Sequence, residues 1–252
     1  MRRRLTRRAV AALSRRIDRP ELLAAFYPGA RQEFHEHVAI RAILAGSLGI
    51  DGTYVDVGTN RGQLLGEAVR VAPHGRHIAF EPIPELASEV ECAFPQVDCR
   101  RLALGAHPGH AEFCHFRSLD GWSGLRRNPE ISDERGDPEY IPVTVSTLDA
   151  ELGELVPRVV KIDVEGAELE VLEGARALLA RARPVVIFEH VAAAAALYET
   201  PPGAPWDLLS ELGYEVFAAT GDGPYTRAAF AASSGVINWL ATPAANGAKA
   251  HG

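Results

Sequence analysis

The sequence has few of the residues that build disulfide frameworks, cysteine metal sites or membrane spans. Its 252 residues include three cysteines, Cys92, Cys99 and Cys114. They are odd in number and show no C-x-x-C spacing, which argues against a disulfide framework and against a zinc site. A reducing, cytoplasmic setting is therefore expected. No segment approaches the roughly 18 consecutive apolar residues that a membrane-spanning helix needs.

Positive charge is also scarce outside the first residues of the chain. The formal net charge is −7, which argues against a general nucleic-acid binder. Residues 1–19 are the exception, with eight arginines and one acid. We expect residues 1–32 to form a solvated, partly helical basic tail, because charge runs are usually solvated. Peripheral contact with an acidic membrane surface or an acidic partner is the alternative.

What the sequence does have is an ordinary globular composition, with 47% hydrophobic residues. This length suits one α/β domain, which we place at 33–241, before an alanine- and glycine-rich tail, 242–252, expected to be disordered. Apolar runs alternate with helical periodicity, which predicts a parallel sheet with helices on both faces. The predicted strands cover 53–57, 77–80, 101–104, 159–162, 185–188, 214–217 and 236–240, and the predicted helices cover 33–48, 63–71, 85–94, 168–180 and 206–212.

The alternation breaks in the middle of the chain. Strands are predicted over 111–117 and 140–147, and a polar stretch from Ser118 to Glu139 lies between them. A loop of this length inside a compact domain is usually functional or disordered. We expect it to cover the active site and to contact the substrate, and a mobile surface loop is the alternative. The expected contacts come from Trp122, Ser123, Arg126 and Arg127, whose guanidinium groups would suit a phosphate or a carboxylate.

The densest motif is YVDVGTNRG over residues 54–62, which reads as a buried strand, a glycine-rich turn and the start of a helix. Gly58 can adopt backbone angles that a Cβ would forbid, and Gly62 would let the turn pass close to a ligand. Asn60 stands where the dinucleotide fingerprint has its second glycine, which admits a pyrophosphate. The turn therefore favours an adenosine-containing ligand without a pyrophosphate, such as S-adenosylmethionine.

A second acid follows the next predicted strand. Glu81 lies about 20 residues after the first glycine turn, where an acid in doubly wound folds hydrogen-bonds the ribose hydroxyls. Pro82 ends this strand. The alternative is that Asp56 and Glu81 only cap helices. The order of strand, acid, turn, helix, strand and acid favours the cofactor interpretation.

Two later strands also end in charged residues. KIDVEG over residues 161–166 delivers Asp163 and Glu165, and the strand at 185–188 is followed by Glu189 and His190. Ligands of open α/β sheets bind outside the carboxyl ends of the strands. The sequence therefore predicts an acidic rim beside the cofactor turn.

With these motifs on the page, the chain resembles the FkbM family of S-adenosylmethionine-dependent methyltransferases. The resemblance implies a class I, Rossmann-like, mostly parallel seven-stranded sheet whose last strand is antiparallel. It also implies O-methylation of a hydroxyl on a sugar, a glycolipid or a natural product. Thr59 departs from the alanine usual in the family. The matching segments are VDVGTNRG (55–62), FEP (80–82), ALG (103–105), STLD (146–149) and KIDVEG (161–166). Cofactor contacts are expected from Asp56, Gly58, Thr59, Asn60, Gly62, Glu81, Pro82, Ala103 and Asp163.

Methyl transfer to an alcohol needs alignment of the acceptor oxygen and is helped by a general base. His190 is the first candidate, because its unperturbed pKa of roughly 6.5 suits neutral pH. Asp163, Glu165 and Glu189 could serve instead or orient the base. A divalent metal held by Asp163 and Glu189 is a further alternative that no ligand spacing dictates. The rival functions are an NAD-dependent oxidoreductase and a non-catalytic binding module that kept the fold.

Overall fold

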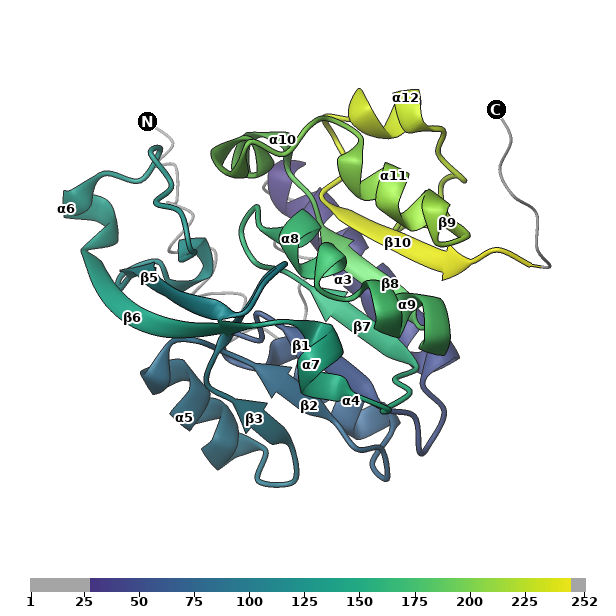
Figure 1. Cartoon of the computed structure of the whole chain (residues 1–252), viewed down its shortest axis with the longest axis horizontal. Coiled ribbons are helices and arrows are strands. Elements are labelled where there is room, and N and C mark those ends of the chain that lie inside the picture. Colours follow the sequence, from purple (N-terminus) through teal and green to yellow (C-terminus); the bar gives the residue numbers. More distant parts are fainter. Residues whose placement is uncertain (1–27, 246–252) are drawn as a thin grey trace.

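The computed structural model describes residues 28–245, in which a seven-stranded sheet lies between two layers of helices (Figure 1). Residues 1–27 and 246–252, which include most of the predicted tails, lie outside the described residues. The strands of this sheet are β1 (Tyr54–Val57), β2 (Ile78–Phe80), β3 (Asp98–Arg100), β7 (Val159–Ile162), β8 (Val185–Glu189), β9 (Tyr214–Ala218) and β10 (Asn238–Pro243).

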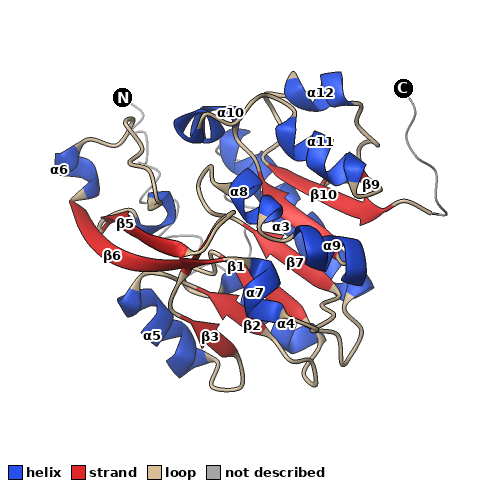
Figure 2. Ribbon diagram, viewed as in Figure 1, coloured by secondary structure: helices blue, strands red, loops and turns tan. Residues whose placement is uncertain are grey.

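Helices connect most of the strands (Figure 2). The described α-helices are α3 (Pro28–Ser47), α4 (Gln63–Val71), α5 (Pro84–Ala93), α6 (Asp133–Gly136), α7 (Leu148–Leu152), α8 (Glu168–Glu173), α9 (Arg176–Ala182), α10 (Ala192–Ala195), α11 (Ala204–Glu211) and α12 (Arg227–Ala231). Two short 3-10 turns are η1 (Asp120–Trp122) and η2 (Ala196–Tyr198).

The strand order of the main sheet is β3-β2-β1-β7-β8-β10-β9. All neighbouring strands are parallel except β10, which pairs antiparallel with both β8 and β9. The prediction of a Rossmann-like, mostly parallel seven-stranded sheet with an antiparallel last strand is therefore confirmed. The carboxyl ends of β1, β2, β7 and β8 meet at one edge, where ligands of such sheets bind.

Side-chain alternation along β1 separates the two hydrophobic cores. Val55 and Val57 face the core formed with α8, α9 and α11, whereas Tyr54 faces the core formed with α3 and α4. Because successive strand residues point to opposite faces, Asp56 lies on the same face as Tyr54. Both faces of the central strands are covered, which explains why these strands read as continuous apolar runs.

A second, three-stranded sheet has the order β4-β6-β5, with β4 (Ala103–Leu104), β5 (Gly109–Phe116) and β6 (Pro138–Ser146). The prediction of one strand over 101–104 is wrong, because two separate strands, β3 and β4, lie in this part of the chain. β3 ends at Arg100 and stays in the main sheet, while Ala103 and Leu104 pair with β6. The physical reason is that β3 is an edge strand with half-buried, mostly polar side chains, so no apolar pattern marks it.

The stretch from Ser118 to Glu139 is folded onto this second sheet. Cys114 and Gly124 exchange two backbone hydrogen bonds, and Trp122 packs against a small core of Cys114, Phe116 and Ile131. The predicted loop is therefore an ordered extension of β5 and β6. Another difference concerns the helix predicted over 168–180, which is divided into α8 and α9 at Gly174.

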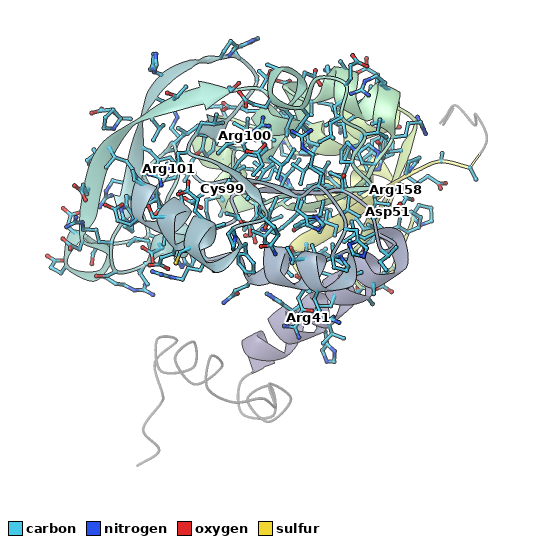
Figure 3. The ribbon with its side chains drawn as sticks, turned by 90° about the horizontal axis from the view of Figure 1, so that it is seen from below. Arg41, Asp51, Cys99, Arg100, Arg101 and Arg158 are labelled. Carbon is cyan, nitrogen blue, oxygen red and sulfur yellow. The ribbon has the colours of Figure 1, made fainter. Side chains whose placement is uncertain are left out.

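Both ends of the described chain pack onto the sheet. α3 begins at Pro28, before the predicted domain start, and β10 continues to Pro243, two residues into the predicted tail. Glu36 on α3 accepts hydrogen bonds from the backbone N–H groups of Ile237 and Asn238, next to β10. Arg41 projects from the outer side of α3 (Figure 3) and pairs with an acid on α4. No described helix combines the length and hydrophobicity needed to span a membrane.

Candidate active site

A pocket with about 690 Å³ of empty space opens at the carboxyl ends of β1, β2 and β7. This space includes the solvent at the open mouth of the pocket. One wall is apolar and includes Phe80, Ile83, Leu104 and Phe113. The opposite end is polar, so the pocket can hold a ligand with one flat apolar part and one charged part.

The glycine-rich turn after β1 brings two backbone segments unusually close together. Gly58 has a φ of 75°, and a Cβ on it would lie 1.8 Å from the carbonyl oxygen of Asp163. Gly58 and Asn60 line the pocket. Gly62 does not line it, which departs from the expected ligand contact. Gly62 instead starts α4 with a φ of 73°, and a Cβ there would lie 2.8 Å from the ring of Phe94.

Asp56 lies beneath this turn and does not line the pocket. Its side chain is 2% exposed and accepts a hydrogen bond from the hydroxyl of Thr59 at 2.8 Å. The Nζ of Lys161 lies 3.8 Å from the other carboxylate oxygen. Burial raises the pKa of Asp56, and Lys161 and Thr59 oppose that rise. Asp56 and Thr59 therefore shape the turn from below, which departs from the direct cofactor contact expected of them.

Glu81 lines the pocket at the end of β2, and Pro82 and Ala103 lie beside it. Its carboxylate accepts hydrogen bonds from the backbone N–H groups of Asn60 at 2.8 Å and of Ile83 at 3.0 Å. Burial raises the pKa of Glu81 to about 7, although the two N–H groups pull it down. The side chain is held in a fixed orientation, with lone pairs left for a ligand's hydroxyl groups.

Binding of S-adenosylhomocysteine is expected to strengthen as the pH rises through about 7, because only ionised Glu81 accepts two ribose hydrogen bonds at full strength. Glu81→Gln should weaken binding by about 1.5–3 kcal/mol, the contribution of hydrogen bonds to a charged group. It should also flatten the pH dependence between pH 5.5 and 8.5, measured by calorimetry. The exposed neighbour Glu85→Gln is the control, and it should bind as the wild type does.

The raised pKa of Glu81 also predicts the direction in which the free energy of unfolding changes with pH. Its pKa is raised in the folded state, so its stabilising contribution is present below the unfolded value of about 4.5 and is lost as the pH rises through about 7. The free energy of unfolding of the wild type should therefore fall relative to Glu81→Gln between pH 5 and 8. The difference should reach at most about 3 kcal/mol. A constant difference in urea unfolding across this range would contradict the assignment.

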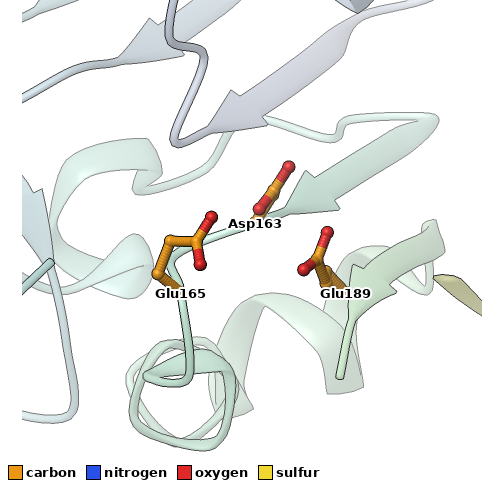
Figure 4. Close-up of side chains that lie close together, drawn as sticks. All are labelled: Asp163, Glu165 and Glu189. Atoms are coloured by element: carbon orange, nitrogen blue, oxygen red, sulfur yellow. The ribbon is translucent and has the colours of Figure 1, made fainter. Parts of the chain in front are cut away.

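Asp163 and Glu165 line the pocket, and their carboxylates point toward that of Glu189, which does not line it (Figure 4). Oxygens from all three lie within 4.8 Å of one another. Burial and then the neighbouring acids raise the pKa values of Glu165 and Glu189. The only described cation bonded to this cluster is Lys161, whose Nζ lies 2.9 Å from Asp163. Burial opposes the charge of Lys161, but Asp163 and Asp56 outweigh it and keep its pKa above the ordinary value.

His190 lies on the opposite face of β8 from Glu189 and does not line the pocket. Its ring stacks on Phe230 at 5.3 Å between centroids, and burial lowers its pKa. The placement departs from the expectation that His190 is the base. The reason is that β8 continues through Glu189, so strand alternation turns the next side chain away.

Of the four residues in segment 118–139 that were expected to contact the substrate, one lines the pocket. Ser123 lines the pocket, but its hydroxyl also accepts the N–H of Phe116. Trp122 is packed in the small core under β5, Arg127 pairs with Asp133, and Arg126 is exposed. None of these three lines the pocket. The pairing of Gly124 with Cys114 of β5 makes side chains alternate here, so Ser123 and Leu125 face the pocket while Trp122 and Arg126 do not line it.

The charge of the pocket is of one sign. Among the described residues that line it, the charged ones are all acids, namely Glu81, Asp120, Asp163 and Glu165. A ligand with a net positive charge is therefore favoured, and a pyrophosphate is disfavoured. At an effective dielectric constant of about 20, two unit charges 4 Å apart interact by about 4 kcal/mol.

A family model described as the methyltransferase FkbM domain matches residues 56–216, more than half of the chain. The chain belongs to the FkbM methyltransferase family. The matched part of this FkbM domain runs from β1 into β9 and includes every residue that lines the pocket. Members of this family use S-adenosylmethionine. No curated protein matches the chain in sequence.

Solved methyltransferase structures match this FkbM domain at low identity and with TM-scores below 0.5. A methyltransferase FkbM from Methylobacillus flagellatus is 16% identical, with a TM-score of 0.47, over 77% of this chain. The match spans 44% of that protein's chain. An O-methyltransferase from Bacillus cereus in complex with SAH is 11% identical, with a TM-score of 0.43, over 85% of this chain and 80% of that one.

Two charged residues of the FkbM domain escaped the sequence analysis. Asp120 lines the pocket from η1, and no local motif marks it because its position depends on the pairing of β5 with β6. Lys161 bridges Asp56 and Asp163. A pattern could have indicated Lys161, because it is one of two lysines in the chain and lies inside an apolar strand. A buried lysine is almost always paired with an acid.

Proposed function

We propose that this chain transfers the methyl group of S-adenosylmethionine to a hydroxyl oxygen of a sugar, a glycolipid or a natural product. The observation that carries the proposal is the charge of the pocket, which has four carboxylates and no cationic side chain in its lining. S-adenosylmethionine carries a sulfonium and an ammonium against one carboxylate, so its net charge is positive. Family membership supports the same cofactor.

The two ends of the pocket fit the two ends of this cofactor. Glu81 would accept hydrogen bonds from the ribose hydroxyls, and the apolar wall with Ile83 and Leu104 would hold the adenine ring. Asp163 and Glu165 would face the methionine part and the transferred methyl group. The cofactor supplies the methyl group and the positive charge that activates it. The protein's own task is to align an acceptor oxygen with that methyl group and to remove a proton.

Glu165 is the proposed base. It lines the pocket, and its carboxylate makes no hydrogen bond to another described residue, whereas Asp163 is held by Lys161. A bound sulfonium favours the ionised form of a neighbouring acid. Glu165 can then take the proton of the acceptor hydroxyl as the methyl group is transferred. Glu189 does not line the pocket, and its carboxylate lies within 4.8 Å of those of Asp163 and Glu165.

Titration of the purified chain with S-adenosylmethionine, S-adenosylhomocysteine and NAD separates the candidate functions. We expect calorimetry to detect both adenosyl ligands and no binding of NAD, because its pyrophosphate would face carboxylates. Incorporation of a labelled methyl group into a panel of sugars and other alcohols then tests the acceptor class. Tighter binding of NAD than of S-adenosylhomocysteine would contradict the proposal, and cofactor binding without transfer to any alcohol would favour a binding module.

The acidic cluster also fits an oxygen-coordinated divalent cation, because Asp163, Glu165 and Glu189 can each offer one ligand atom. A metal there would lower the pKa of an acceptor hydroxyl. Prolonged treatment with a chelator distinguishes the two chemistries. Transfer that survives chelation supports the carboxylate base, and transfer that is lost and then restored by Mg²⁺ assigns the deprotonation to a metal.

A further inference from the structure

The outer wall of the pocket comes from a single segment of the chain, residues 119–126, which includes η1. Asp120, Gly121, Ser123 and Leu125 all line the pocket from this segment. The segment belongs to the second sheet, because Gly124 pairs with Cys114 of β5. A ligand in the pocket would therefore contact both the main sheet and an extension of the smaller sheet.

Two polar contacts join this wall to residues of the main-sheet part within 28–245. At one end, Arg61 donates to the Oδ2 of Asp120 at 2.8 Å. At the other end, the backbone N–H of Arg126 donates to the hydroxyl of Tyr198 at 3.0 Å. Arg61 is part of the glycine-rich turn, between Asn60 and Gly62, so the first contact lies beside the expected cofactor site.

Arg61 is placed to act on Asp120 without contacting the ligand. Its side chain is 38% exposed and does not line the pocket. The guanidinium also pairs with Glu89 on α5. Arg61 therefore connects α5 to the wall. Asp120 in turn has both oxygens engaged, since the Nε2 of His115 lies 3.1 Å from its Oδ1. Each carboxylate oxygen of Asp120 therefore has its own partner, which fixes the geometry of the Arg61–Asp120 ion pair.

A continuous chain of contacts connects the wall to the ribose-binding acid. Glu81 accepts the N–H of Asn60, and the side-chain oxygen of Asn60 accepts the N–H of Arg61 at 2.9 Å. Arg61 then reaches Asp120. Asn60, which lines the pocket, and Arg61, which holds the wall, are thus consecutive in the chain.

We propose that Arg61 is a positioning residue whose ion pair with Asp120 latches the wall formed by residues 119–126 over the bound cofactor. The inference rests on the proposed function, because the latch matters only if the pocket takes an adenosyl ligand. The latch must open for exchange of the cofactor and the product. It therefore sets how fast the ligand leaves rather than which ligand binds.

Surface plasmon resonance with S-adenosylhomocysteine as the probe tests this proposal on the full chain. Arg61→Gln should raise the dissociation rate constant by about two- to fivefold, the range that a partly exposed ion pair provides. The association rate constant should also rise, so the dissociation constant changes less than either rate. Arg61→Lys retains a cation and should restore most of the slow release.

Salt dependence separates a latch from a general effect on folding. Raising the ionic strength from about 0.05 to about 0.5 M should accelerate release from the wild type, because salt screens an exposed ion pair. Arg61→Gln should have lost this response, while its urea midpoint stays unchanged. Arg70→Gln is the matched control, because Arg70 is exposed on α4, which begins two residues after Arg61, and pairs within that helix with Glu67.

The outcomes distinguish this proposal from the proposed function. If the wild type binds neither S-adenosylmethionine nor its product, both proposals are overturned. If the wild type binds the product and Arg61→Gln releases it at the wild-type rate, the latch alone is overturned. Equal acceleration in Arg70→Gln would assign the effect to net charge and would also overturn the latch.

Discussion

Replacing Gly58 with valine is expected to abolish detectable binding of S-adenosylhomocysteine. A Cβ at this position would lie 1.8 Å from the carbonyl oxygen of Asp163, so the turn after β1 and the segment after β7 would have to separate. Both segments line the pocket, and their separation would displace Asn60 and Asp163 together. The φ of 75° adds about 1–2 kcal/mol of strain for any residue with a Cβ. Calorimetry measures the loss of affinity.

Gly153→Val is the matched control for this experiment. Gly153 also has a positive φ, 49°, but a Cβ there would meet nothing within 4 Å. We expect it to lower the free energy of unfolding by about 1–3 kcal/mol, because φ 49° with ψ −120° is a strained conformation for a residue with a Cβ, and to leave ligand affinity unchanged. Gly58→Val should add about 1–3 kcal/mol of overpacking to its own conformational strain. A folded Gly58→Val protein with wild-type affinity would show that the close approach of the two turns is dispensable.

Those parts of the fold that depend on local pattern could be predicted from the sequence. β7 and α4 have the predicted ends, because an isolated apolar run between breakers and a periodic helix leave few alternatives. The glycine-rich turn and Glu81 were also found where the motif puts them. These features are encoded within a few consecutive residues, so no knowledge of distant contacts was needed.

Features set by distant contacts could not be predicted. Gly62 looked like a ligand contact, but its lack of a side chain matters because Phe94 from α5 packs against it. Trp122 was predicted to contact the substrate, but it packs against the small core that forms when β5 and β6 pair. Such roles depend on which segments meet in space. A single sequence carries no local record of that.

The directions of the side chains at the end of β8 could be predicted only in part. Strand alternation already implied that Glu189 and His190 could not both face the cofactor, but it did not fix where the strand ends. The structure extends β8 through Glu189, which puts this acid beside Asp163 and turns His190 toward Phe230. One residue of strand length thus decides which of two adjacent side chains reaches the rim.

Glu165→Gln is therefore expected to lower the maximal rate of methyl transfer by about 10²–10⁴-fold, the usual contribution of a general base. The substitution keeps the shape of the side chain and removes its ability to take a proton. Affinity for S-adenosylhomocysteine should change little, because this product lacks the sulfonium charge. The measurement is transfer of a labelled methyl group to an alcohol that the acceptor panel identifies, together with calorimetry on the same samples.

His190→Ala provides the contrasting variant. Its ring packs on Phe230 and does not line the pocket, so we expect a near-normal rate and an unchanged pH profile, with a loss of stability from the emptied stack. If the rate of this variant loses its pH dependence near neutrality while Glu165→Gln stays active, His190 is the base. β8 would then have to twist when the cofactor binds. If both variants retain the rate while a chelator abolishes it, the proton is removed by a metal-activated path through Asp163 and Glu189.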